Sequence, residues 1–382
     1  MSFKIKTQIP YILLTLSIFA HGCFQNQSSN STDIAAGNLY AQGFEITESN
    51  TGFTIKMLSP WMNSFEDSFE YELTRIEPTV KNNTIHRQKI GIPLKRVAIM
   101  STTHLAMIIA IDELPTIVGI SEIQYVNNPK FWKHHTLNPV TEIGYENSLD
   151  FEATVKLMPD AVFIYGLSSA ILQTATRLIK VGIPVIFVSE FNELHPLAKT
   201  EWIRYISCFY DKYELADSIL NQKEIRYNKA KGIVVNIATK PTVLTGLPWK
   251  DIWDTPGART TTATYIDDAG AQYIFHDMDK KINYQMGIET VFLKAGKADY
   301  WINVGISNSK KEILDTDSRF KNFDALNNNK VFNNNKIQNN VGGNDYMESG
   351  VMHPDLILMD LISIFHPELL PNYITKYYKK IE

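Results

Sequence analysis

The sequence is short of cysteines and of long apolar runs, and both shortages exclude classes of protein. Its 382 residues include two cysteines, Cys23 and Cys208, which excludes a disulfide framework and sites built from cysteine pairs. Beyond the N-terminus, no stretch of about 18 apolar residues occurs, so no membrane-spanning helix is expected there. The net charge of −4 gives no basic surface, so nucleic acid is not expected as a partner.

The N-terminus has the features of an export signal. Two lysines precede an apolar run, Ile9 to Ala20, that is too short to span a bilayer, and the sequence AHGC follows it. We therefore expect a signal peptide over residues 1–22, lipid attachment at Cys23, and a flexible polar tether over 23–39. The alternative is an ordinary signal peptide in which the cysteine occurs by chance. In both cases the protein is exported, and lipidation would anchor it to a membrane.

The remaining chain predicts an α/β protein with two lobes. Residues 40–93 contain strand-like segments and predict a β-rich N-terminal extension. Short apolar runs alternate with helical patterns over 94–197 and again over 233–382, which predicts parallel strands flanked by helices in each lobe. Between them, residues 198–232 contain apolar residues spaced by three and four and no proline. This segment predicts one long rigid helix that joins the lobes.

Two stretches of the chain repeat the same order of residues. FEATVKLMPDAVFIYG begins at Phe151 and IETVFLKAGKADYWINVG begins at Ile288. Each has an apolar residue, a glutamate (Glu152 or Glu289), a short helical pattern, and a hydrophobic strand that ends in glycine. A carboxylate near a helix N-terminus is favoured by the helix dipole, which explains each glutamate by itself. It does not explain why both lobes place one at the same position.

These stretches, with KRVAIMSTTHLAMIIAI, YIDDAGAQYIF and NDYMESGVMHPDLIL, give the chain a resemblance to a known family. Residues 94–370 resemble the substrate-binding proteins of ABC importers for ferric siderophores, haem and vitamin B12. The resemblance implies a monomer without a cofactor, whose lobes enclose a metal chelate and deliver it to a permease dimer. It also implies that Glu152 and Glu289 dock into arginine pockets on the two permease subunits.

The resemblance and the strand-end loops suggest which residues face the ligand, because ligands of parallel sheets bind at the carboxyl ends of strands. The candidates are Thr102, Thr103, Tyr125, Tyr165, Trp249, Trp253, Arg259, Asn344 and Tyr346. The tryptophans offer flat apolar contact area, and the arginine can bind carboxylates or catecholates. For haem, Tyr125, Tyr165 or His104 could serve as an axial ligand. Ile143-Gly144 replaces the Trp-Gly of the B12-binding members, which argues against cobalamin.

Three other functions stay open at this point. YGLSSA resembles the nucleophile elbow of a hydrolase, with Ser168 or Ser169 as nucleophile, but Ala170 stands where the elbow requires glycine. Either serine more simply caps the following helix. Direct binding of a metal ion is a second alternative, although His104, His134 and His135 lack the spacing of a metal site. A structural or adhesive surface lipoprotein is the third.

Overall fold

The computed structural model describes residues 34–58, 68–76, 78, 83–145, 148–165, 169–279 and 282–382. The predicted signal peptide, the lipidation site Cys23 and the candidate nucleophile Ser168 lie outside these residues. The chain separates into a segment Met1–Thr32 and a compact unit Asp33–Glu382, and the fold below is that of the compact unit. Among the described residues, no helix combines the length and the apolar character needed to cross a membrane.

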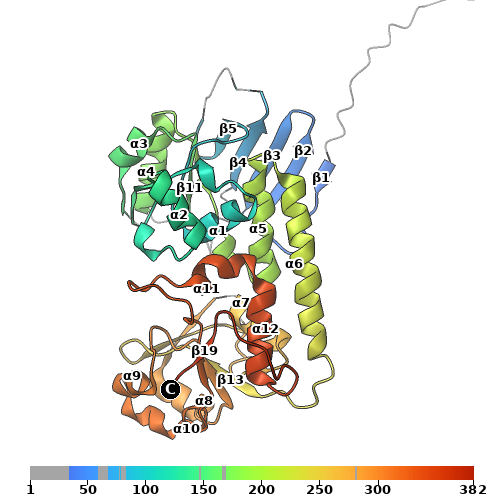
Figure 1. The fold of residues 1–382 in the computed structure, drawn as a ribbon, viewed down its shortest axis with the longest axis vertical. Helices are drawn as coiled ribbons and strands as arrows, with labels where there is room; N and C mark the ends of the chain where they lie inside the picture. The colour runs from blue at the N-terminus through green and yellow to red at the C-terminus, as the bar shows by residue number, and fades with distance from the viewer. Residues whose placement is uncertain are drawn as a thin grey trace, which may run out of the picture. The chain divides into compact units, whose positions relative to one another are not determined.

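Five strands nearest the N-terminus form one sheet, at the blue end of the colours in Figure 1. Their order in the sheet follows the sequence; β1 to β4 are antiparallel neighbours, and β5 runs parallel to β4. The strands are β1 (Ile34–Ala36), β2 (Phe44–Ser49), β3 (Gly52–Leu58), β4 (Ser68–Thr74) and β5 (Arg87–Gly91). On β4, Phe69, Tyr71 and Leu73 are buried and the residues between them are more exposed, which is the alternation of a half-buried strand.

This sheet is built into the first lobe and is not a separate extension. The side chain of Gln88 donates to the carbonyl of Val185 at 2.6 Å and accepts from its N–H at 2.9 Å. The hydroxyl of Tyr71 accepts from the N–H of Phe187 at 2.9 Å, and Phe69 packs on the ring of Phe187. One hydrophobic core includes residues of this sheet and residues of the parallel sheet of the first lobe. Strands β1 to β5 are therefore an outer layer of the first lobe.

The first lobe has a parallel sheet flanked by helices, which confirms the predicted fold class. Its strands are ordered β12-β11-β6-β7-β8 and all neighbours are parallel. The elements are β6 (Val97–Ile99), α1 (Thr102–Ala110), β7 (Ile117–Ile120), α2 (Pro129–Leu137), β8 (Thr141–Glu142), α3 (Phe151–Leu157), β11 (Ala161–Ile164), α4 (Ser169–Lys180) and β12 (Val185–Phe187). A small hairpin, β9 (Gly144–Tyr145) and β10 (Ser148–Leu149), precedes α3.

The prediction of one continuous helix over residues 198–232 is wrong. The segment forms two helices, α5 (Pro196–Cys208) and α6 (Tyr213–Ile233), which lie side by side in Figure 1. The chain reverses between them at a turn in which Asp211 has a φ of 55°. Aspartate tolerates this left-handed conformation, so the turn needs neither glycine nor proline. The apolar spacing also continues across the turn, which concealed it in the sequence.

Helix α6 makes the connection between the lobes. Ala216, near its N-terminus, belongs to the core of the first lobe, whereas Tyr227 and Ala230, near its C-terminus, belong to the core of the second. The connecting helix has 21 residues, which corresponds to roughly 30 Å at 1.5 Å per residue.

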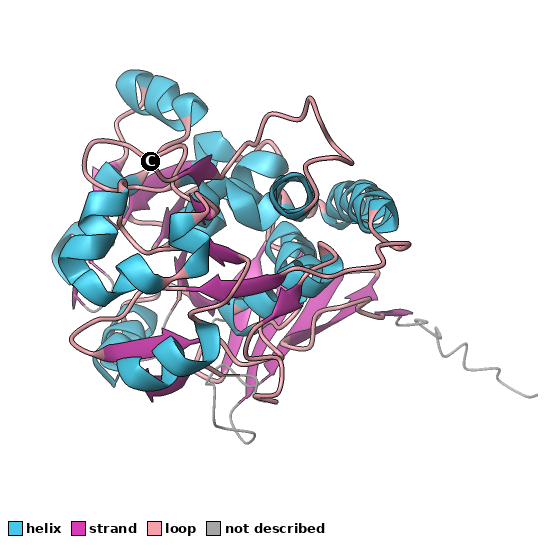
Figure 2. Ribbon diagram, turned by 90° about the horizontal axis from the view of Figure 1, so that it is seen from below, coloured by secondary structure: helices cyan, strands magenta, loops and turns pink. Residues whose placement is uncertain are grey.

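The second lobe holds another sheet, ordered β15-β13-β17-β18-β19, in which only β19 is antiparallel to its neighbour. Figure 2, viewed from the side of this lobe, shows helices arranged around the strands. Its strands are β13 (Thr242–Thr245), β15 (Gln272–Tyr273), β17 (Tyr300–Ile302), β18 (Val331–Asn333) and β19 (Lys379–Lys380), with a separate antiparallel pair, β14 (Ile252–Thr255) and β16 (Tyr284–Gly287). Its helices are α7 (Thr261–Asp268), α8 (Ile288–Ala295), α9 (Lys310–Thr316), α10 (Asp324–Asn327), α11 (Asp345–Glu348) and α12 (Pro354–Phe365).

The repeated stretches of the sequence form the same pair of elements in the two lobes. The first becomes α3 followed by β11, and the second becomes α8 followed by β17. In both, the strand lies inside the sheet with a parallel neighbour on each side. The repeat in the sequence is therefore a repeat in the fold.

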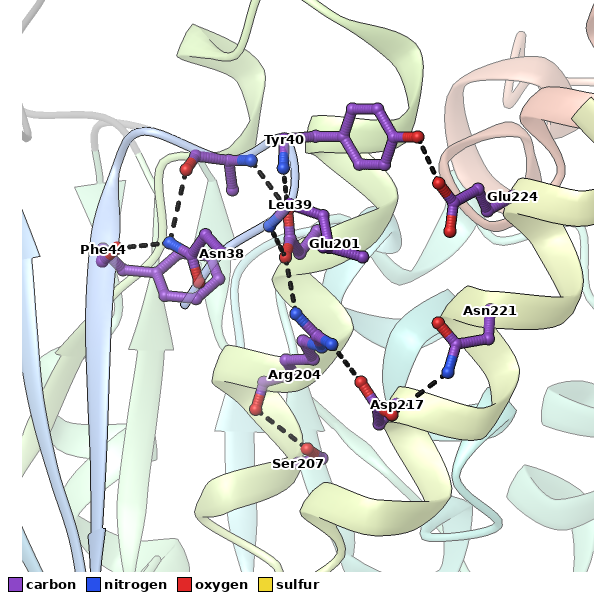
Figure 3. Close-up of polar contacts among 11 residues, drawn as sticks. Asn38, Leu39, Tyr40, Phe44, Glu201, Arg204, Ser207, Asp217, Asn221 and Glu224 are labelled. Atoms are coloured by element: carbon purple, nitrogen blue, oxygen red, sulfur yellow. Dashed lines mark hydrogen bonds and ion pairs between the residues drawn. The ribbon is translucent and has the colours of Figure 1, made fainter. Parts of the chain in front are cut away.

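Residues 38–43, which we call the strap, are held against α5 by a buried carboxylate (Figure 3). Glu201 of α5 has no exposed surface and accepts hydrogen bonds from the backbone N–H groups of three successive residues, 39–41, at 2.7 to 2.8 Å. Arg204 donates to the same carboxylate at 2.8 Å and pairs with Asp217 of α6. The strap is therefore fixed to both helices of the connection.

Replacing Glu201 by glutamine should lower the free energy of unfolding by about 3 kcal/mol, because it breaks a buried ion pair and leaves Asp217 as the remaining carboxylate partner of Arg204. Denaturant titration of the purified protein measures this change. Glu224→Gln is the matched control, since Glu224 is only partly buried and bonds one strap side chain, Tyr40. Equal losses in the two variants would show that Glu201 has no special role.

Candidate functional site

Thr102 and Thr103 begin α1 at the carboxyl edge of the first-lobe sheet. Ser101 caps this helix, because its hydroxyl accepts from the N–H of Thr103 at 3.1 Å. The hydroxyl of Thr103 donates to the carboxylate of Glu190 at 2.6 Å. Glu190 follows β12 and begins a short 3₁₀ helix (Glu190–Asn192). Two predicted ligand residues are thus adjacent to a buried carboxylate that was not predicted.

A buried polar cluster lies behind these threonines. The imidazole Nε2 of His104 is 4.0 Å from Oε2 of Glu190, and both side chains are almost wholly buried. The ring of Tyr165, at the end of β11, is 6.4 Å from the His104 ring. Burial lowers the pKa of His104, although the Glu190 carboxylate acts to raise it, so the imidazole is neutral at neutral pH. A carboxylate beside a neutral imidazole favours cationic or neutral groups over anions.

Asn344 and Tyr346 lie at the start of α11. Asn344 caps the helix by accepting a hydrogen bond from the N–H of Tyr346 at 3.0 Å. The ring of Tyr346 packs edge-on against Tyr377 and Tyr378, at centroid distances of 6.0 and 5.9 Å. Burial raises the pKa of Tyr346 to about 12, so the phenol stays protonated at neutral pH. Both side chains are half-buried, and their contact with a ligand stays a prediction.

The loop that precedes α11 reaches the first lobe beside Tyr125. The amide of Asn339 donates to the carbonyl of Gln124 at 2.8 Å. Gly343 lies so close that a Cβ would be 2.1 Å from the carbonyl oxygen of Tyr125, so this contact requires glycine. The structure therefore brings Tyr125 and the segment around Asn344 together across the two lobes.

Glu348, at the end of α11, also crosses between the lobes. Its Oε2 accepts from the N–H of Asn127 at 2.6 Å and its Oε1 accepts from the N–H of Asn128 at 3.1 Å. Asn128 caps α2, whose first turn carries Pro129. The partners are 220 and 221 residues away in the chain, so no local pattern around Glu348 predicts them. The one available signal was Asn-Pro, which marks a helix start with free N–H groups.

The two tryptophans after β13 have opposite environments. Trp253 has no exposed surface; its indole N–H donates to the carbonyl of Thr245 at 2.9 Å, and its ring packs on Trp301 and Phe320. The prediction that Trp253 faces a ligand is wrong, because its position on β14 directs the ring into the second-lobe core. Trp249 is 76% exposed and precedes a two-residue hairpin turn.

Arg259 is engaged within the second lobe. Its Nε lies 2.6 Å from a carboxylate oxygen of Asp279, and both side chains are largely exposed. Such surface pairs contribute little, so the guanidinium remains available to an anionic group. The contacts that the described residues make do not bring Trp249 or Arg259 together with Thr103 and Tyr125.

Glu152 and Glu289 occupy the first turns of α3 and α8, and both side chains are exposed. Arg319 donates from Nη1 to both carboxylate oxygens of Glu289, at 2.8 and 2.9 Å, and Asp317 binds the same guanidinium. An exposed pair of this kind contributes little because solvent screens it, so another cation can replace Arg319.

The alternatives drawn from the sequence find limited support. The described residues contain no group of three or more His, Cys, Asp or Glu that could hold a metal ion. His134 and His135 lie in the last turn of α2. The imidazole Nδ1 of His135 accepts a hydrogen bond from the backbone N–H of Val140 at 3.1 Å, just beyond the end of the helix. Ser169 begins α4, but residues 166–168 of the proposed elbow are outside the described residues.

Among the described residues, hollows of about 370 and 380 Å³ each lie within one part of the fold. The first lies beside α7 and β15 in the second lobe. The second lies on the N-terminal sheet among charged side chains of β4 and β5. Neither is lined by a predicted ligand residue.

The opposite environments of the two tryptophans lead to a stability prediction. Trp253→Ala should lower the free energy of unfolding by about 4 kcal/mol, because it leaves a large cavity in the second core. Trp249→Ala should change it by less than about 0.5 kcal/mol, since its side chain is mostly in solvent. Thermal or denaturant unfolding of both variants measures the difference. A large loss for Trp249→Ala would mean that this ring packs in the fold.

Comparisons with known proteins agree with the two-lobe fold. Residues 97–336 match the sequence profile of the periplasmic binding protein family. An uncharacterized lipoprotein of Methanocaldococcus jannaschii is 23% identical over 302 residues, 76% of this chain and 70% of the relative. A periplasmic heme binding protein from Pseudomonas aeruginosa has a TM-score of 0.58 at 13% identity, covering 76% of this chain and 98% of the other. The molybdate periplasmic binding protein MolA of Haemophilus influenzae has a TM-score of 0.57 at 17% identity, covering 75% of this chain and 91% of the other.

Proposed function

Because this chain belongs to the periplasmic binding protein family, we propose that it is the solute-binding component of an ABC importer and encloses a metal chelate between its lobes. The observation that carries the proposal is the contact between the lobes beside Tyr125 and α11, which lies next to the strand-end residues of the first lobe. Attachment of a lipid to Cys23 would keep the protein at the membrane that holds the permease.

The chemistry of the first-lobe edge supports a metal complex over an oxyanion. An oxyanion such as molybdate at the start of α1 would meet the Glu190 carboxylate, which accepts the hydroxyl of Thr103 at 2.6 Å. Like charges at short range repel, whereas the metal centre or neutral face of a chelate would be attracted. We therefore favour an iron chelate, either a siderophore or haem, with a cobalamin-like complex as the next choice. Trp249 and Arg259 would contact apolar and anionic groups on its periphery.

Movement of the lobes would be small in this proposal. The connection consists of α6 packed along α5, and the strap binds both helices. A pair of packed helices resists bending more than a single strand connection does. Capture would therefore take place by a modest opening and closing of the two lobes, followed by transfer to the permease.

Titration of the mature protein with a panel of ligands tests the class of ligand. We expect saturable tryptophan quenching by one of ferric siderophore, haem or cobalamin, and none by molybdate or zinc. Tyr125→Ala should weaken that binding about 10-fold, the equivalent of about 1.4 kcal/mol. Tyr145→Ala is the matched control, since this tyrosine is also exposed but lies on the β9–β10 hairpin. Binding of molybdate alone would overturn the chelate assignment.

The docking role of the glutamates is tested separately. Each is accompanied by a strongly exposed apolar residue on or at the end of the same helix, Met158 for α3 and Leu293 for α8. A carboxylate flanked by exposed apolar surface suits a protein partner with basic and apolar groups.

Glu152→Gln with Glu289→Gln should abolish transport in vesicles that hold the cognate permease, while chelate binding stays unchanged. Loss of chelate binding in this double variant would contradict the assignment.

A further inference from the structure

The structural repeat of the two lobes includes exposed apolar residues near Glu152 and Glu289. An antiparallel pair of strands precedes each helix, β9 and β10 before α3, and β14 and β16 before α8. The first strand of each pair exposes a large apolar residue, Tyr145 at 62% and Ile252 at 47%. As noted above, each helix also exposes an aliphatic residue at or near its C-terminal end. Each glutamate is thus accompanied by exposed apolar residues on its strand pair and on its helix.

In the second lobe a tight turn adds Trp249 to this surface. The backbones of Trp249 and Ile252 bond each other at 2.8 and 3.1 Å, so Lys250 and Asp251 form a two-residue turn. Both turn residues have positive φ, 48° and 63°, which glycine or asparagine usually supplies in such turns and which is unfavourable for lysine. Strained backbone of this kind is concentrated at functional sites. The Trp249 side chain beside the turn is 76% exposed.

The turn is fastened to the helix that carries Glu289. The N–H of Ile288, the first residue of α8, donates to the carbonyl of Asp251 at 3.1 Å. Ile252 pairs with the residue that caps α8, and Glu289 is the second residue of that helix. Trp249 and Ile252 are therefore fixed beside the start of α8.

We propose that Tyr145 in the first lobe, and Trp249 and Ile252 in the second, form two matching patches through which this protein binds the two subunits of the permease. These side chains supply most of the affinity, because buried aromatic residues are where the binding energy of protein interfaces concentrates. The glutamates mainly steer the encounter and set the orientation, as exposed charges do. That the partner is a permease rests on the proposed function. Trp249 can contact the periphery of a ligand in the free protein and the permease once docked.

The charges on the patches favour a protein partner over a lipid surface. Glu152 and Glu289 are carboxylates, which the negative surface of an anionic bilayer repels. The cations beside the second patch are engaged within the chain, since Lys250 lies 5.8 Å from the centre of the Trp249 ring and Arg319 binds Glu289. A basic group surrounded by apolar side chains on a protein matches each patch. Because the patches are alike, they suit a partner that presents the same surface twice.

Binding of the mature protein to the cognate permease in lipid nanodiscs tests the patches, with both rate constants measured by surface plasmon resonance. Tyr145→Ala and Trp249→Ala should each raise the dissociation rate about 10-fold and leave the association rate within about twofold of the wild type. Ile252→Ser, at a position with no proposed ligand contact, should also raise the dissociation rate. Leu137→Ala is the matched control, since this residue of α2 is 73% exposed but belongs to neither patch.

The double variant Glu152→Gln with Glu289→Gln should behave differently from the patch variants. It should lower the association rate at low ionic strength, and this effect should shrink at high salt, because salt screens exposed charges. Binding of the wild type that is equal on nanodiscs without permease would assign the patches to lipid and overturn the proposal. If the wild type binds the permease and the patch variants dissociate no faster, the patches fail and the docking function stands. If the wild type does not bind the permease, both fail.

Discussion

Buried carboxylates that bind successive backbone N–H groups hold distant parts of this chain together. Glu201 binds three N–H groups of the strap, and Glu193 binds the next two. Asp360 of α12 does the same for residues 376–378 near the C-terminus. A buried charge costs several kcal/mol unless donors compensate it, so each carboxylate and its segment of backbone depend on one another.

The number of donors that compensate the buried charge differs between these carboxylates. Glu201 has three N–H donors and an arginine, all between segments that belong to the first lobe and the connection. Glu348 has two N–H donors and a nearby carboxylate, Asp345, and it joins the two lobes. The best-compensated charge thus fixes the framework, and a less compensated one lies at the contact between the lobes.

Features with a local cause were predictable from the sequence. The parallel sheets and the repeated pairs α3–β11 and α8–β17 follow from apolar periodicity within short windows. The reversal at Asp211 was missed because an aspartate replaces the usual glycine and the helical spacing continues past it. Trp253 was misassigned because the sequence places an aromatic in a polar loop, whereas pairing of β14 with β16 directs it into the core.

The candidate site was only partly predictable for a similar reason. Thr103 and Tyr125 follow strands, and their place at the sheet edge is a rule of parallel folds. Glu190 and Glu348 act through partners on other elements, 87 and more than 200 residues away, so their role requires knowledge of the tertiary structure. The contributions of Trp249, Arg259, Asn344 and Tyr346 to ligand binding depend on contacts with the ligand, which no pattern within the chain encodes.

The strap also determines the order in which this protein can acquire its native structure. Its donors precede their acceptors in the chain by about 150 to 162 residues. A polypeptide that crosses a membrane from its N-terminus presents the first five strands long before α5 emerges. The inner face of that sheet, with Phe69 and Tyr71, must therefore remain without its native cover until β12 and α5 arrive. Folding of the first lobe can therefore finish only after α5, which lies beyond the midpoint of the chain, has become available.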